Sequence, residues 1–190
     1  HFADLDPVLM KQLALNDPGN AYSVPYLWGA IGIGYNKAMI KERLGTDEID
    51  SLDVFFKPEN AAKLADCGLT VLDSSSEIMA TALVYLGIDP NSEDAEDLAK
   101  GTELLKTLRP HVRYFHSSQF INDLANGAVC ITLGYAGDMV NARERAAEAK
   151  NGVELSIVTP KEGGILFFDV MAIPKDAPNP ENAYAFINYI

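Results

Sequence analysis

Short apolar runs alternate along the chain with longer segments in which apolar residues recur every three or four positions. The first pattern is typical of buried strands and the second of amphipathic helices. Residues that commonly start or end helices bound the longer segments, as Asp6-Pro7 and Gly45 do. Helices are therefore predicted over 6–15, 36–44, 58–66, 75–86, 92–108, 118–125, 139–150 and 182–190, and strands over 23–35, 69–72, 112–115, 129–134, 155–158 and 165–173.

Alternating strands and helices of this length predict an α/β protein with a largely parallel sheet. With 190 residues and 48% hydrophobic content, the chain is expected to bury a sizeable core. Its longest apolar stretches, 165–168 and 170–173, are separated by Asp169 and are far too short to cross a bilayer. The chain is therefore expected not to span a membrane.

The charge balance limits the classes of partner that the chain is expected to bind. Asp and Glu together number 27 against 15 Lys and Arg, which gives a formal net charge of −12. Such a chain repels phosphate backbones, so nucleic acid is not an expected partner. The charge suits a cationic ligand, but acidic surfaces are also common without one.

Familiar catalytic and cofactor motifs are absent from the sequence. Gly32-Ile33-Gly34 resembles the start of a dinucleotide fingerprint, but Lys37 stands where the third glycine is needed, so the glycines indicate close backbone approach or a hinge. His111 and His116 flank a predicted strand and do not share a helix face, so neither a metal site nor a cofactor is predicted.

Cys67 and Cys130 lie 63 positions apart, with neither redox-motif nor zinc-site spacing. Two buried thiols and one disulfide both fit this spacing. An oxidising compartment would allow the disulfide.

Three carboxylates stand at positions that could receive a cation. Asp169 interrupts an apolar strand, where a carboxylate is costly unless a cation or hydrogen-bond donor meets it. Asp138 follows the strand over 129–134, at the strand end where open α/β sheets bind ligands, but it could also be a helix N-cap. Glu77 could likewise belong to a capping box with Ser74.

Two aromatic residues flank these carboxylates. Tyr135 stands three positions before Asp138, and Phe167 stands two before Asp169 on the same strand face. They could be core residues, or they could join the carboxylates in a box around an ammonium group. Cation–π attraction would then contribute roughly 0.5 to 2 kcal/mol.

Several strings occur in the order found in one family, and together these strings resemble the bacterial periplasmic putrescine- and spermidine-binding proteins of ABC importers. They are Val24–Trp28 leading into Gly32–Asn36, then Arg113–Gln119, Ile121–Gly127, Gly134–Asp138 and Phe167–Asp169. The resemblance covers essentially the whole chain.

The resemblance implies a type II periplasmic binding protein fold, with two lobes joined by crossover strands at a hinge. Residues 1–31 and 157–190 would belong to lobe one, and 32–156 would form a nearly complete lobe two. Because the predicted helix at 182–190 has no stop signal, we expect the chain to be a fragment that lacks both ends, with the first lobe incomplete. The implied function is polyamine binding and delivery to an ABC transporter permease in the periplasm, without catalysis.

By position, the resemblance makes Glu77, Asp138 and Asp169 the acceptors of ligand amines. Tyr135 and Phe167 would be aromatic walls, and Cys67 and Cys130 would form a disulfide. Many members carry Trp where this chain has Tyr135, so the resemblance does not select one polyamine. The alternatives are a binding protein for another cationic solute and a cytoplasmic α/β enzyme that uses the strand-end carboxylates as acid and base.

Overall fold

The structure is a computed structural model that describes residues 6–190. It contains two compact units, and each is described by itself. The discontinuous unit combines the chain up to Gly29 with Leu166–Ile190, and the continuous unit runs from Ala30 to Ile165. Residues 1–5, the start of the predicted lobe-one segment 1–31, lie outside the described residues.

The continuous unit alternates strands and helices after the second half of β1 (Val24–Asn36). In chain order its elements are α2 (Lys37–Leu44), α3 (Asp53–Phe56), α4 (Pro58–Leu64), β2 (Leu69–Val71), α5 (Ser75–Tyr85), α6 (Ala95–Leu108), the short 3₁₀ helix η2 (Arg109–His111), β3 (Val112–Phe115), α7 (Phe120–Ala125), β4 (Ile131–Tyr135), α8 (Ala136–Ala149) and β5 (Leu155–Val158).

The strands of this unit follow the order β3-β2-β4-β1-β5. β2 pairs in parallel with β3 and β4, whereas β1 pairs antiparallel with β4 and β5. The α/β class is thus confirmed, but the sheet is mixed, because β1 runs against the other four strands. β1 starts in the discontinuous unit, so no crossover helix within the continuous unit sets its direction.

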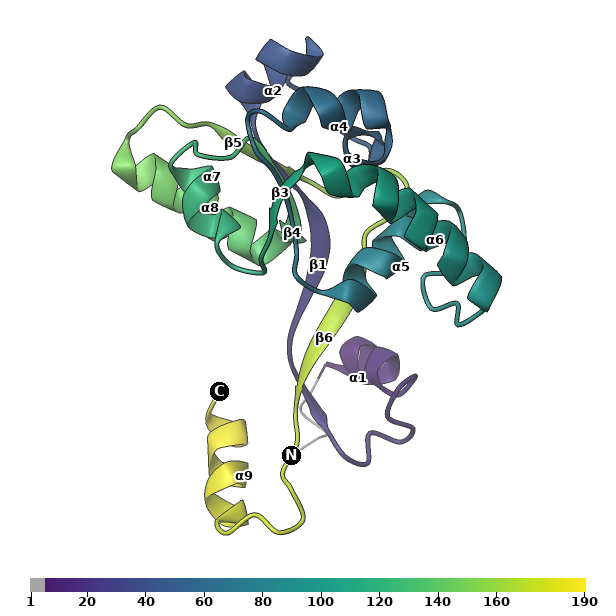
Figure 1. The fold of residues 1–190 in the computed structure, drawn as a ribbon. Coiled ribbons are helices and arrows are strands. Elements are labelled where there is room, and N and C mark those ends of the chain that lie inside the picture. The colour runs from purple at the N-terminus through teal and green to yellow at the C-terminus, as the bar shows by residue number, and fades with distance from the viewer. Residues whose placement is uncertain (1–5) are drawn as a thin grey trace. The chain divides into compact units, whose positions relative to one another are not determined.

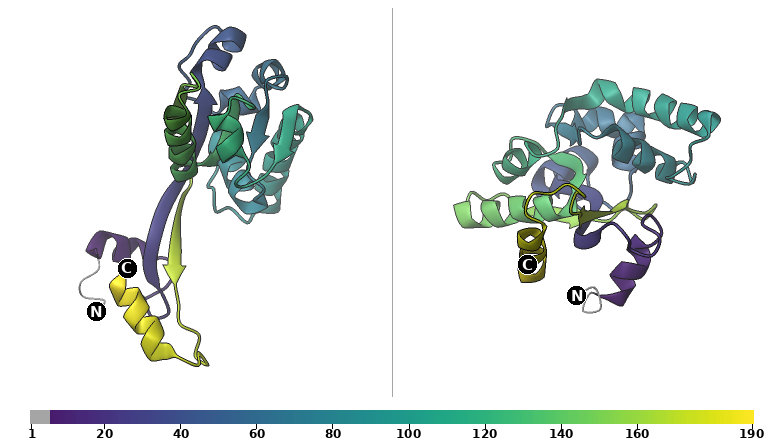
Figure 2. Two further views of the ribbon diagram at one scale, coloured as in Figure 1. Left: turned by 90° about the vertical axis from the view of Figure 1, so that its left-hand side faces the viewer. Right: turned by 90° about the horizontal axis from the view of Figure 1, so that it is seen from below.

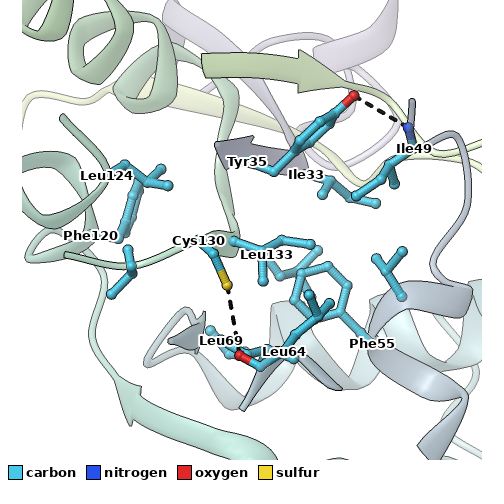
Figure 3. Close-up of a cluster of buried hydrophobic side chains, with 14 of the residues drawn as sticks. Ile33, Tyr35, Ile49, Phe55, Leu64, Leu69, Phe120, Leu124, Cys130 and Leu133 are labelled. Carbon is cyan, nitrogen blue, oxygen red and sulfur yellow. Dashed lines mark hydrogen bonds between the residues drawn. The ribbon is translucent and has the colours of Figure 1, made fainter. Parts of the chain in front are cut away.

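Helices lie on both sides of these strands. α7 and α8 pack together on one side, and α3–α6 group on the other (Figures 1 and 2). Between the layers, fully buried side chains from strands and helices meet, among them Ile33, Phe55, Leu64, Leu69 and Leu133 (Figure 3). This core fixes β4, which ends at Tyr135, and β2, which precedes the helix that carries Glu77.

Most predicted boundaries agree with the structure to within a few residues, and the short helix η2 was not predicted. Helix α8 begins at Ala136, three residues earlier than predicted, and α3 was not predicted. Gly32 of β1 fits the interpretation of close backbone approach, whereas a Cβ at Gly34 would meet the Met139 side chain. A Cβ at Gly32 would lie 2.8 Å from the carbonyl oxygen of Val158, so only glycine fits there.

The discontinuous unit holds α1 (Pro7–Leu13), the first half of β1, β6 (Leu166–Met171) and α9 (Pro180–Tyr189). Asp6 caps α1, because its carboxylate accepts the backbone N–H groups of Val8 and Leu9. β6 adds to the sheet by pairing with β1. Over residues 6–190, no helix combines the length and apolarity needed for a membrane crossing.

Candidate functional site

The five predicted ligand residues are divided between the two units. Glu77, Tyr135 and Asp138 belong to the continuous unit, and Phe167 and Asp169 belong to the discontinuous unit. The structure brings Glu77 and Tyr135 into direct contact and places Asp138 in the turn after Tyr135. Phe167 and Asp169 lie on one strand, β6.

Glu77 and Tyr135 are joined by a hydrogen bond although 58 positions separate them in the sequence. The Tyr135 hydroxyl donates to Oε2 of Glu77 over 2.8 Å, and both residues are half-buried. Glu77 is the third residue of α5, and Tyr135 is the last residue of β4. The contact therefore ties the first turn of a helix to the end of a strand.

The capping-box interpretation of Glu77 is wrong. Ser74 is the N-cap of α5, but its side chain makes no capping hydrogen bond, and the Glu77 carboxylate accepts the phenol instead. The Glu77 carboxylate therefore contacts the end of β4 and not the start of its own helix. Sequence reasoning could not find this partner, because nothing local links positions 77 and 135.

The N-cap interpretation of Asp138 is also wrong. Because α8 begins at Ala136, the cap position is Tyr135, and Asp138 is the third residue of the helix. The Asp138 side chain is half-buried, and within residues 6–190 no hydrogen bond reaches its carboxylate. Burial raises the pKa of Asp138 above its ordinary value, and the charge of Arg145 opposes this only in part.

A half-buried carboxylate without a hydrogen bond is an unfavourable arrangement that a cation would relieve. Asp138 lies in the first helical turn, where the positive end of the helix favours a negative charge. Since the pKa of Asp138 is nonetheless raised, the cost of desolvating its charge exceeds the stabilisation that the helix start provides. The geometry therefore suits the arrival of an ammonium group.

Phe167 and Asp169 alternate along β6 and so share one face of that strand. The Phe167 ring is half-buried and lies against Gly29, where an added Cβ would come within 2.5 Å of the ring. Asp169 is exposed, as are several of its neighbours in β6. Among the described residues, the apolar run of β6 is therefore partly exposed, and Asp169 stays a candidate.

The disulfide between Cys67 and Cys130 is present, which confirms the pairing that the family resemblance implied. Both residues are buried, and their Cα atoms are 5.5 Å apart. Cys67 follows α4 and Cys130 directly precedes β4, the strand that ends at Tyr135. The covalent link therefore fixes the start of the strand that presents Tyr135.

Two hollows in the described structure contain none of the predicted residues. One, of about 590 Å³, lies between the start of β1, the end of β6 and α9, and Tyr22, Met171, Tyr184 and Ile187 are among its lining residues. The other, of about 600 Å³, lies beside Tyr35, Lys37 and Asp47. Each hollow lies within one unit, and neither explains the placement of Glu77, Tyr135 and Asp138.

Comparison with known proteins shows which family the chain resembles over its length. The sequence profile described as bacterial extracellular solute-binding protein matches residues 2–190. The chain is 52% identical to the putrescine-binding periplasmic protein PotF of Escherichia coli, over 98% of the chain and 51% of that protein. It is 48% identical to the putrescine-binding periplasmic protein SpuD of Pseudomonas aeruginosa, over 100% of the chain and 52% of that protein.

A solved structure is also similar over nearly the whole chain. The spermidine/putrescine ABC transporter substrate-binding protein PotD from Streptococcus pneumoniae matches with a TM-score of 0.73 and 29% identity, over 99% of this chain and 53% of that one. The chain thus spans about half the length of the relatives it matches.

Proposed function

The chain belongs to the bacterial extracellular solute-binding proteins, and from this premise we propose that it forms part of a periplasmic receptor for a polyamine of the putrescine or spermidine type. The single observation that carries the proposal is its 52% and 48% identity to two putrescine-binding periplasmic proteins across almost all of its length. The disulfide supports an oxidising compartment such as the periplasm.

In this proposal the polyamine binds between two lobes. Residues 1–31 and 157–190 contribute to lobe one, and residues 32–156 form lobe two. Glu77 and Asp138 receive ligand nitrogens from lobe two, and Asp169 receives one from lobe one. Tyr135 and Phe167 cover the methylene chain, and charge-assisted hydrogen bonds from the ammonium groups to the carboxylates fix the ends.

The protein then passes its ligand to the permease of an ABC transporter and carries out no reaction. The half-buried Asp138 carboxylate, which lacks a hydrogen bond among residues 6–190, supports a cation as the ligand. Burying that carboxylate against an ammonium group replaces a desolvated charge with a paired one. A different cationic solute would use the same groups, so the ligand panel must include several amines.

The test is calorimetric titration of the complete gene product with putrescine, spermidine and other amines. Asp138→Asn and Asp169→Asn are each expected to weaken polyamine binding at least tenfold, which corresponds to about 1.4 kcal/mol. Asp94→Asn is the matched control, because it removes the same charge from an exposed N-cap of α6 where Asn caps equally well.

Three outcomes would overturn the proposal in whole or in part. Absence of binding to every amine by the unaltered protein would refute the function. Unchanged affinity in both Asp138→Asn and Asp169→Asn would refute the site while leaving the family intact. A tenfold loss in Asp94→Asn would show that the net charge, rather than the two placed carboxylates, governs affinity.

A further inference from the structure

The hydrogen bond between Tyr135 and Glu77 changes what Glu77 can offer a ligand. A carboxylate has two oxygens, and together they can accept two parallel N–H bonds from one planar group. Here Oε2 already accepts the phenol hydroxyl at 2.8 Å, whereas Oε1 receives no hydrogen bond from residues 6–190. Among the described residues, Glu77 therefore keeps one carboxylate oxygen without a hydrogen-bond donor.

The same contact fixes the direction of the Glu77 side chain before any ligand binds. Glu77 has no capping role in α5, so within the described residues the phenol is the hydrogen-bonding group that orients its carboxylate. The phenol is itself fixed, because Tyr135 ends β4, whose residues are buried next to the Cys67–Cys130 link. A side chain held in its binding conformation loses less entropy when the ligand arrives.

A single free oxygen discriminates between two kinds of cationic end group. An ammonium is a compact charge whose N–H groups each point to a separate acceptor, so one oxygen suffices for one contact. A guanidinium is planar and pairs most strongly when both oxygens of a carboxylate accept its two parallel N–H groups. At Glu77 that fork would have to compete with the phenol for Oε2.

We propose that Tyr135 is a positioning residue that holds Glu77 as a one-oxygen acceptor and thereby selects ligands with ammonium ends over ligands with guanidinium ends. The inference rests on the proposed polyamine function and adds the residue that discriminates ammonium ends from guanidinium ends. It assigns the preference to the hydroxyl of Tyr135 and not to its ring.

The experiment compares two ligands with the same four-carbon spacer, 1,4-diaminobutane and 1,4-diguanidinobutane, by calorimetric titration of the complete gene product. Because both ends of each ligand are identical, the direction in which it binds does not matter. The unaltered protein is expected to prefer the diamine. Tyr135→Phe keeps the ring and removes the hydroxyl, and it should weaken diamine binding about tenfold, as expected when a hydrogen bond to a charged group is lost.

Affinity for the diguanidine should fall less than the diamine affinity, or rise, because Oε2 becomes available to the guanidinium fork. The preference for the diamine therefore shrinks in Tyr135→Phe. In a Glu77→Gln background the added Tyr135→Phe change should have little further effect, because the hydroxyl acts through the carboxylate. A hydroxyl that acted on the ligand directly, and not through Glu77, would give the same loss in both backgrounds.

Tyr85→Phe is the matched control. Tyr85 also donates to a carboxylate, that of Asp53, at 2.9 Å, and it lies at the opposite end of α5 from Glu77. Its loss should leave the preference between the two ligands unchanged. Equal weakening of both ligands by Tyr135→Phe, or an undiminished effect of this change in the Glu77→Gln background, would overturn the inference.

The two proposals fail in different ways. If the unaltered protein binds no diamine, the proposed function is refuted. If it binds the diamine but Tyr135→Phe does not alter the ratio of the two affinities, only the role of Tyr135 is refuted. Glu77→Gln alone offers a second route, since it should also reduce the diamine preference while keeping Tyr135 in place.

Discussion

Asp138 is the residue at which stability and ligand binding oppose each other. Its carboxylate is half-buried, and its raised pKa means that the folded chain holds this proton more tightly than the unfolded chain does. The free energy of unfolding therefore decreases as the pH rises from the unfolded-state pKa through the folded-state value. At neutral pH the ionised carboxylate destabilises the unliganded protein.

Asp138→Asn should accordingly raise the melting temperature of the unliganded protein at neutral pH, although it weakens ligand binding. The gain should shrink as the pH is lowered through the raised pKa, because the native carboxylate then becomes neutral. Scanning calorimetry across the acidic range measures both effects. A lower melting temperature at neutral pH, or a gain that does not depend on pH, would contradict this account.

The sequence made Glu77, Tyr135 and Asp138 candidate ligand residues but did not predict the contacts that they make in the structure. Composition and spacing allowed capping for both carboxylates, since Ser74 and the position of Asp138 fit helix-start preferences. The structure removes both capping roles, because α8 begins before Asp138 and Glu77 accepts a distant phenol. A contact across 58 positions depends on how the sheet brings β4 beside β2, which no local pattern encodes.

At the scale of elements, β1 depends on glycine for close packing. Its register places Ile33 opposite Val158 of β5, and the neighbouring Gly32 lies against the Val158 carbonyl. A methyl group at position 32 would meet backbone, which cannot move aside as a flexible side chain could. This contact explains why the Gly32-Ile33-Gly34 string resembles a nucleotide motif without serving as one.

Gly32→Ala should therefore destabilise the protein by about 1–3 kcal/mol, the usual cost of overpacking. The matched change Gly137→Ala should act in the opposite direction, stabilising by about 0.5–1 kcal/mol, because Ala is the better helix former. Gly137 lies in the first turn of α8, and an added Cβ there meets nothing within 4 Å. Urea unfolding measures the free energy of unfolding of both variants. Equal changes in Gly32→Ala and Gly137→Ala would refute the packing argument.

Element types were predicted better than element starts. The strands Val112–Phe115 and Leu155–Val158 agree with prediction, because apolar runs and turn residues bound them. The start of α8 was predicted too late, because Gly137 is a typical turn residue and yet lies inside the first turn of this helix. α3 spans four residues, too few for a helical repeat of apolar positions to be visible in the sequence.

At the scale of the whole molecule, the alternation of strands and helices predicted the α/β class, but it did not predict that β1 runs antiparallel to its neighbours β4 and β5. Crossover helices account for β2, β3, β4 and β5 running the same way, and they say nothing about a strand that enters from another unit. The resemblance, carried by strings such as Gly134–Asp138, predicted the family that the profile match establishes. It also predicted the disulfide, which spacing alone left open.

Removing that disulfide should reduce stability substantially. Cys67 and Cys130 close a loop with a sequence separation of 63. On the loop-entropy model such a link contributes about 4 kcal/mol. The double variant Cys67→Ala/Cys130→Ala should lose about this free energy of unfolding in urea titrations. Reductant should lower the free energy of unfolding of the unaltered protein and leave that of the double variant unchanged. If reductant does not change the stability of the unaltered protein, the prediction is contradicted.

The division of the chain into a continuous and a discontinuous unit also has a consequence for the order of biosynthesis. Everything between Ala30 and Ile165, including both cysteines, is delivered before the last segment of the discontinuous unit, Leu166–Ile190. Domains generally fold as units in the order in which the chain emerges. The continuous unit can therefore begin to fold before Leu166–Ile190, which carries β6 and α9, has emerged.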